Sequence, residues 1–201
     1  KGPKLNFFIG AAVNIDNISA PASSIYVQDG GTSNTSYLPA VSFGVNFFAN
    51  PSTKQLQFRL ELSAAQSQFK SLYPLKVSPY IPFKASFDKL TVSFAPQIIY
   101  NFYNAENLKV YGGLGIALCY FKFSNSYLGS QKQPNSATDI EENDPYYFNK
   151  IDDTFILKAG VQIHRNWGIF AQYMTSVLDT KGGYFGMNST VEQVGINYYF
   201  K

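Results

Sequence analysis

The 201-residue sequence predicts an all-β fold, an eight-stranded antiparallel up-and-down barrel formed as a single domain over residues 1–201. Three observations predict this fold. Apolar and polar residues alternate with a period of two along the chain, and short connections alternate with long ones. No segment reaches the roughly 20 consecutive apolar residues that a membrane-spanning helix needs.

The first four strands are expected within residues 5–15, 41–47, 56–63 and 90–102. In each, every second residue is apolar, and the residues between are small or polar, so one face of the strand is apolar and the other is not. In the third strand, for example, Leu56, Phe58 and Leu60 alternate with Arg59 and Glu61. Phe8 is an apolar residue on the polar face of the first strand.

The last four strands are expected within residues 108–120, 154–164, 167–176 and 193–200. They repeat the alternation, although Phe170 and Met174 interrupt the polar face of the seventh strand. Short links are expected at residues 49–53, 104–107 and 165–166, and long links at 16–36, 71–86, 124–150 and 178–186. The two kinds of link therefore separate onto opposite ends of the barrel, and an even number of strands puts both termini on the short-link end.

The composition indicates which face meets which solvent. Aromatic residues make up 17% of the chain, and charged residues make up 14%, well below the roughly 25% of soluble domains. The polar faces carry Gly, Ser, Ala, Asn and Gln rather than the Lys and Glu of a water-facing surface. These side chains suit a narrow barrel interior, so the apolar faces are expected to meet lipid. A soluble lipocalin-like carrier, with the faces inverted, is a remote alternative.

Aromatic residues at the strand ends support a membrane position. Outer-membrane barrels have short periplasmic turns, long extracellular loops and aromatic girdles at both membrane boundaries. Apolar-face aromatics gather beside the short links, and we expect them to form the periplasmic girdle: Phe47, Phe58, Tyr100, Phe102, Trp167, Tyr198 and Phe200. The sequence therefore predicts a transmembrane barrel in a bacterial outer membrane, with both termini periplasmic.

Two segments resemble a known group of proteins. They are the glycine-spaced strand VYGGLGI at residues 110–116 and the terminal strand VGINYYF at residues 194–200. The whole chain resembles small outer-membrane barrels of the OmpA/OmpX type, and is most similar to the Bacteroidota "outer membrane protein beta-barrel domain" proteins. The terminal strand resembles the signal read by the barrel-assembly machinery, although Lys201 follows its last aromatic residue. The resemblance implies outer-membrane lipid, that machinery and envelope proteins as partners, but no function.

Three charged residues are expected to point into the barrel: Arg59, Glu61 and Lys158. They could form a gate or an ion path, or they could neutralise one another in a filled interior. We favour a filled interior, because an eight-stranded barrel leaves little room for a channel and an unpaired buried charge is costly.

No constellation of residues predicts catalysis. His164 is the only histidine, it lies beside a short link, and no Gly-x-Ser-x-Gly motif accompanies it. The acidic segment 139–144 lacks the spacing of an EF-hand loop, and we interpret it as solvated; no metal and no cofactor are expected. The net charge of +3, without a Lys/Arg cluster, gives no reason to expect nucleic acid.

We therefore expect a non-enzymatic outer-membrane barrel that acts structurally or binds a partner through its extracellular loops or its wall. Tyr146, Tyr147 and Phe148 are candidate contact residues in the fifth-to-sixth strand link. A narrow pore for ions or small solutes, and an accessory subunit of a larger outer-membrane secretion or assembly complex, are the alternatives.

Overall fold

A computed structural model describes residues 5–19, 33–48, 55–74, 82–130, 151–164, 166–179 and 186–200. These ranges form eight antiparallel strands. The strands are β1 (Leu5–Ser19), β2 (Ser33–Phe48), β3 (Leu56–Pro74), β4 (Pro82–Asn104), β5 (Leu108–Ser130), β6 (Ile151–Ile163), β7 (Trp167–Asp179) and β8 (Gly186–Tyr199). Within these ranges no helix is long and apolar enough to cross a membrane.

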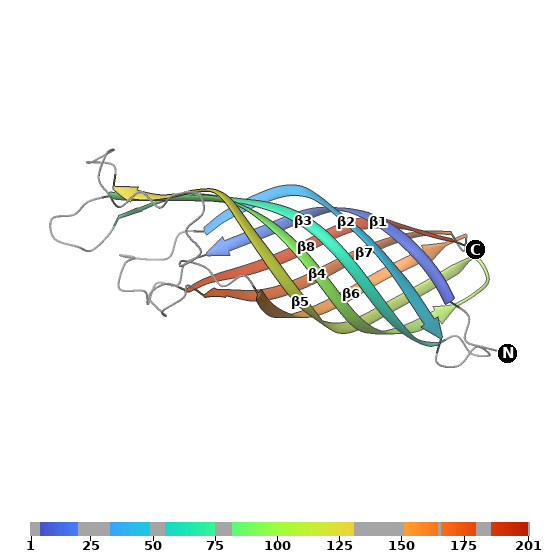
Figure 1. Ribbon diagram of the computed structural model, residues 1–201. Coiled ribbons are helices and arrows are strands. Elements are labelled where there is room, and N and C mark those ends of the chain that lie inside the picture. Colours follow the sequence, from blue (N-terminus) through green and yellow to red (C-terminus); the bar gives the residue numbers. More distant parts are fainter. Residues whose placement is uncertain are drawn as a thin grey trace.

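The strands follow one another around a closed barrel in sequence order, and β1 pairs with β8 to close it (Figure 1). This confirms the predicted up-and-down antiparallel barrel. Closure gives the backbone groups of every strand a neighbour on both sides along the barrel wall, which lipid could not supply. β1 begins and β8 ends at the same end of the barrel, beside the short connections (Figure 1).

The strands extend further toward the long-link end than predicted. β3 reaches Pro74, β4 begins at Pro82 and β5 reaches Ser130, so the expected links at 71–86 and 124–150 were wrong for the residues that lie in these strands. The expected link at 16–36 likewise loses residues to β1 and β2, and the expected link at 178–186 loses residues to β7 and β8. The alternation of apolar residues fades there, but backbone pairing continues, for example between Tyr73 and Phe83.

The extension is uneven around the barrel. β4 and β5 each have 23 residues, whereas β6 and β7 each have 13. A tilted strand needs only about 9–11 residues to cross the hydrocarbon layer. Strands β3, β4 and β5 therefore project beyond the rest of the wall at the long-link end (Figure 1).

The predicted direction of the two faces is confirmed. Large apolar side chains are exposed on the outer surface from end to end, as Ile9, Phe43, Phe94 and Ile116 illustrate. The buried side chains include a large polar set: Asn14, Asp16, Asn46, Gln57, Arg59, Glu61, Lys89, Gln97, Lys158, Gln172, Gln193 and Asn197. A soluble barrel would have the opposite distribution, so the lipocalin-like alternative is not supported.

Inward-facing glycines let large side chains lie across the narrow lumen. Gly44 pairs with Phe8, and a Cβ at Gly44 would lie 2.5 Å from the Phe8 ring. Gly160 pairs with Tyr111 in the same way, and a Cβ there would lie 2.5 Å from the Tyr111 ring. The glycine spacing of these strands is therefore a packing requirement, because a ring on one strand occupies the space that a neighbouring side chain would need.

The wall between β2 and β3 ends at a proline. Their pairing stops at Ala40 and Ala65, so the next pair would be Pro39 with Gln66. Proline has no N–H to donate, and Asn14 Nδ2 donates instead to the Gln66 carbonyl at 3.1 Å. Side chains take over where the backbone ladder ends.

Candidate functional site: the lumen and its rim

The structure brings Arg59, Glu61 and Lys158 together inside the barrel. Lys158 Nζ lies 2.6 Å from Glu61 Oε2, and Arg59 Nη1 lies 3.9 Å from the same oxygen. All three side chains are buried. Gln97 Nε2 also donates to Glu61 Oε2 at 3.4 Å, so one carboxylate lies among two cations and an amide.

The guanidinium of Arg59 is enclosed toward the short-link end. Arg59 Nε donates to Asn46 Oδ1 at 2.8 Å, and Nη2 donates to the Tyr199 hydroxyl at 3.3 Å. The same group lies 4.6 Å from the centre of the Phe8 ring and 5.5 Å from that of Tyr111. Aromatic faces attract a cation held this close, so the rings stabilise the charge while they fill the lumen.

A second ion pair lies further toward the long-link end, and the sequence analysis missed it. Lys89 Nζ lies 2.7 Å from Asp16 Oδ2 and donates to Ser189 Oγ at 3.2 Å, while Ser189 Oγ donates to Asp16 Oδ1 at 2.8 Å. Lys89 alternates in phase with the inward residues Ser93 and Gln97, so its position on the strand was a readable signal. It was missed because the first strand was ended at residue 15 and the fourth was begun at residue 90.

Neutral polar side chains connect strands between the two ion pairs. Gln193 Nε2 donates to Asn14 Oδ1 at 2.9 Å, and Gln172 Nε2 lies 3.5 Å from Gln193 Oε1. The hydroxyls of Ser63 and Ser93 share a hydrogen bond of 2.6 Å. These contacts join β1, β3, β4, β7 and β8 across or around the lumen, and they satisfy groups that have little access to water.

An apolar cluster fills the lumen at the long-link side. Its buried members are Ile18, Phe69, Phe87, Ala95, Ala117, Cys119, Phe121, Ile156 and Met174. The Phe69 and Phe87 rings stack at 5.1 Å, and Phe123 packs edge-on against Phe87 at 5.4 Å. The Lys89–Asp16 pair lies against this cluster, since Lys89 Nζ is 5.4 Å from the centre of the Phe121 ring. Charged and apolar side chains therefore fill this part of the lumen together.

The predicted girdle residues lie on the outer surface beside the short connections. Phe58, Tyr100, Phe102, Trp167 and Phe200 are exposed, whereas Phe47 and Tyr198 are half-buried. Several of the rings pack edge to face, including Tyr100 with Phe102 at 5.3 Å and Trp167 with Tyr198 at 5.1 Å.

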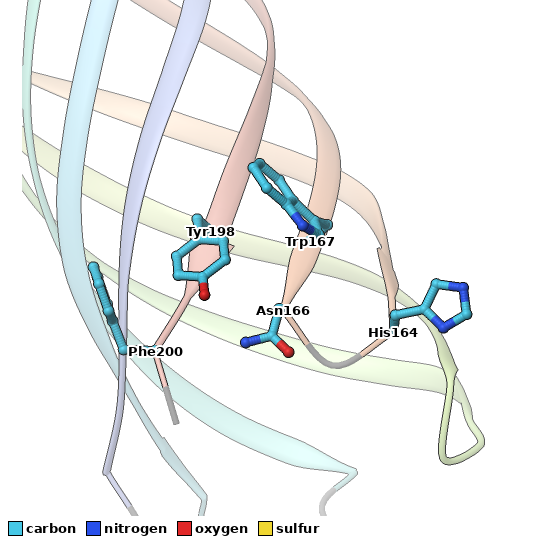
Figure 2. Close-up of a pocket in the computed structure, with 5 residues that line it drawn as sticks. All are labelled: His164, Asn166, Trp167, Tyr198 and Phe200. Carbon is cyan, nitrogen blue, oxygen red and sulfur yellow. The ribbon is translucent and has the colours of Figure 1, made fainter.

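One end of this girdle forms a shallow hollow of about 510 Å³. Its lining residues are His164, Asn166, Trp167, Tyr198 and Phe200 (Figure 2). Four of these residues were predicted separately from the sequence, as girdle members or as the only histidine, and the structure brings them together. Asn166, which was not predicted, lies in the turn between β6 and β7 and is tied to β8, since its Nδ2 donates to the Tyr199 carbonyl at 3.0 Å.

The turn that carries the hollow has an unusual backbone. His164 has a φ of 50°, and among the described residues it is the one non-glycine residue with a positive φ. Its N–H donates to the Asn107 carbonyl at 2.9 Å, which joins this turn to the neighbouring turn between β4 and β5. Left-handed backbone at a residue other than glycine is uncommon, so the surrounding bonds hold the turn in this shape.

Two predicted regions lie outside the described residues. These are the contact residues Tyr146, Tyr147 and Phe148, and the acidic segment 139–144. Within the described ranges no group of three or more His, Cys, Asp or Glu side chains is placed to hold a metal ion. His164 lies in a turn at the edge of the hollow, with its ring directed away from the other lining residues (Figure 2).

The closed antiparallel barrel, with an apolar exterior and a polar, filled interior, defines a class: the small transmembrane β-barrels. No protein-family model matches the sequence, and no curated protein matches it.

Solved structures similar to the chain have low sequence identity. The attachment invasion locus protein Ail of Yersinia pestis is 16% identical with a TM-score of 0.47, covering 98% of this chain and 99% of that one. Neisserial surface protein A is 13% identical with a TM-score of 0.47, covering 96% and 97%. Outer membrane protein OprG of Pseudomonas aeruginosa is 14% identical with a TM-score of 0.48, covering 97% and 95%. The class rests on this chain's own topology and polarity, and kinship with Bacteroidota proteins stays a prediction.

Proposed function

We propose that the protein is a non-enzymatic integral barrel of the bacterial outer membrane whose lumen is closed and whose role is structural or is to bind a partner. Its working surfaces are then the extracellular loops and the lipid-facing wall. The main support is the packing inside the lumen, where the Glu61 carboxylate is paired with Lys158 and lies beside Arg59. Toward the long-link end, the apolar cluster that includes Phe69 and Phe87 packs beside the Lys89–Asp16 pair.

The narrow-pore alternative requires a continuous water path. Two observations oppose it: charged side chains are paired across the lumen rather than lining an open passage, and buried apolar rings pack beside the Lys89–Asp16 pair. A hydrophobic constriction excludes water and therefore ions. An accessory-subunit role remains a version of the proposal, in which the wall or the projecting β3–β5 sheet contacts an envelope partner.

Orientation and assembly belong to the same proposal. The short connections, the start of β1 and the end of β8 face the periplasm, and the projecting parts of β3, β4 and β5 face the exterior. The barrel-assembly machinery inserts the chain, and outer-membrane lipid surrounds it. Envelope proteins are the partners proposed for the barrel wall.

Membrane partitioning and conductance test the proposal together. The exported protein is expected in the outer-membrane fraction, with a gel mobility that changes on boiling. In planar bilayers the purified barrel is expected to give no steady conductance above that of protein-free bilayers. A control variant in which Phe69 and Phe87 are both changed to Ala removes two rings of the apolar cluster, and it checks that the assay detects an opened lumen. A soluble, detergent-independent protein would refute the membrane location, and stable single-channel currents from the unchanged protein would favour the pore.

A further inference from the structure

The hollow beside the turn between β6 and β7 has the surface chemistry of a lipid site. Three of its five lining residues are aromatic, and they continue the apolar outer wall formed by Ile169 and Ile196. The remaining two, His164 and Asn166, carry an imidazole and an amide. A ligand placed here would touch ring faces on one side and polar groups on the other.

Hydrogen-bond donors gather along one margin of the hollow. Figure 2 shows the Trp167 indole nitrogen and the Tyr198 hydroxyl directed toward the side where Asn166 lies. Within the part of the chain that the structure describes, neither group has a protein hydrogen-bond partner, although the two rings pack edge to face at 5.1 Å. Asn166 uses one amide hydrogen on the Tyr199 carbonyl, and an amide nitrogen carries two.

Among the residues that the structure describes, none of those that line the hollow carries a carboxylate. Indole, phenol and amide donors without a negative group suit an acceptor-rich ligand such as a phosphate group. The position of the hollow indicates that the ligand also has an apolar part, because the hollow lies where the apolar wall ends at the membrane boundary. A headgroup at this level would continue into acyl chains that lie along the wall.

The site is also held in shape before any ligand arrives. The Asn166 backbone carbonyl accepts from the Tyr199 N–H at 2.7 Å, and the His164 N–H donates to the Asn107 carbonyl. These bonds join the β6–β7 turn to β8 on one side and to the β4–β5 turn on the other. A preformed site orders few groups on binding, which favours the retention of one lipid among the many that surround a barrel.

We infer that this hollow is a selective site for one glycerophospholipid of the leaflet at the short-turn end, with the lipid phosphate on Trp167, Tyr198 and Asn166 and an acyl chain along the aromatic faces. His164 lies at the outer edge of the site, with its ring directed away from the other four residues (Figure 2). The inference rests on the proposed function, since it requires the barrel to be in a membrane.

The sequence provides a reporter inside the site, because Trp167 is the only tryptophan. The protein is reconstituted in vesicles of phosphatidylcholine that carries bromine on its acyl chains. The bromine atoms quench the fluorescence of a tryptophan that touches the lipid. Unbrominated phosphatidylethanolamine or a phosphate-free galactolipid of the same chain length is then mixed in. Phosphatidylethanolamine is expected to restore Trp167 fluorescence in proportion to its share. The galactolipid is expected to compete about fivefold less well, the factor that one net hydrogen bond gives.

Two variants complete the experiment. Tyr198→Phe keeps the ring but removes the hydroxyl, and it should bring the two competitors closer together. Trp167→Phe combined with Phe102→Trp moves the reporter to β4, at an exposed girdle position on the same end of the barrel. Both lipids should compete equally there. A boiling-sensitive gel mobility establishes that each variant is folded.

The outcomes separate the inference from the proposed function. Equal competition by the two lipids at Trp167, as at the position 102 control, would overturn the selective site and leave the membrane barrel intact. Absence of quenching by brominated lipid at either reporter position would overturn the membrane location itself. Selectivity at Trp167 that Tyr198→Phe reduces would support the site.

Discussion

Substituting Glu61 with Gln tests whether the lumen is held together by charge pairing. The change preserves shape but removes the carboxylate that lies 2.6 Å from Lys158 Nζ and 3.9 Å from Arg59 Nη1. Two buried cations then remain without a counter-charge. Removing one partner of a buried pair typically costs about 3–5 kcal/mol, and we expect Glu61→Gln to reach this range in the free energy of unfolding.

Lys158→Met is the matched comparison. It removes one cation and leaves Glu61 with Arg59 and Gln97, so the remaining charges balance. We expect a smaller loss of about 1–2 kcal/mol, because a charged hydrogen bond is lost while an ammonium no longer has to be buried. The double variant should lose about the same as Lys158→Met alone, because Arg59 still has Asn46 and Tyr199 as partners.

Urea unfolding of the barrel in small lipid vesicles measures these differences, with the folded fraction followed by the mobility of unboiled samples on a gel. The charge argument requires strong non-additivity, with a coupling energy of about 2 kcal/mol or more between positions 61 and 158. A Glu61→Gln variant no less stable than Lys158→Met would refute the reasoning. Additive losses in the double variant would refute it as well.

Three further substitutions probe other parts of the interior by the same unfolding assay. Lys89→Met leaves Asp16 buried without its cation and should cost about 3–5 kcal/mol, whereas Lys89→Met with Asp16→Asn should recover most of that loss. Gly160→Ala should cost about 1–3 kcal/mol, because the new Cβ meets the Tyr111 ring at 2.5 Å and the Ile169 carbonyl oxygen at 2.6 Å; Tyr111→Leu in the same chain should recover only the part of the loss that comes from the ring. Asn14→Ala should cost about 1–3 kcal/mol, since it removes a donor to β3 and an acceptor from β8; a change within 0.5 kcal/mol of the parent would show that water replaces both contacts.

The fold was predictable because a barrel in lipid has to display its period-two pattern openly. Every strand must present apolar residues outward and smaller or polar residues inward, so the direction of Arg59, Glu61 and Lys158 followed from their position in the alternation. Their mutual contact was harder to predict from sequence, because β3 and β6 are not neighbours in the wall. It depends on how far each strand is staggered around the barrel, which side-chain alternation does not reveal.

The large apolar side chains that point into the lumen were not predicted, and the reason is physical. Phe8, Phe170 and Met174 interrupted an otherwise polar face, so a pattern-based interpretation treated them as noise. In the structure they point inward: Phe8 lies under the Arg59 guanidinium, and Lys158 Nζ lies 4.6 Å from the centre of the Phe170 ring. A filled lumen needs volume as well as polarity, and aromatic rings supply both when a cation lies over their faces.

The way the lumen is filled determines where side chains are available to bind a ligand. The charged side chains of the narrow interior pair with one another across it, and the side chains around them leave little access for a solute. Some buried atoms, such as Gln97 Oε1 and the Tyr111 hydroxyl, have no hydrogen-bond partner among the described residues, but they are enclosed. On the outer wall, Trp167, Tyr198 and Asn166 beside the short turns have hydrogen-bonding groups within reach of the surroundings. The described residues therefore direct the search for function away from the barrel axis and toward the outer wall, where the surrounding lipid is itself a ligand, and toward the end where β3, β4 and β5 project beyond their neighbours.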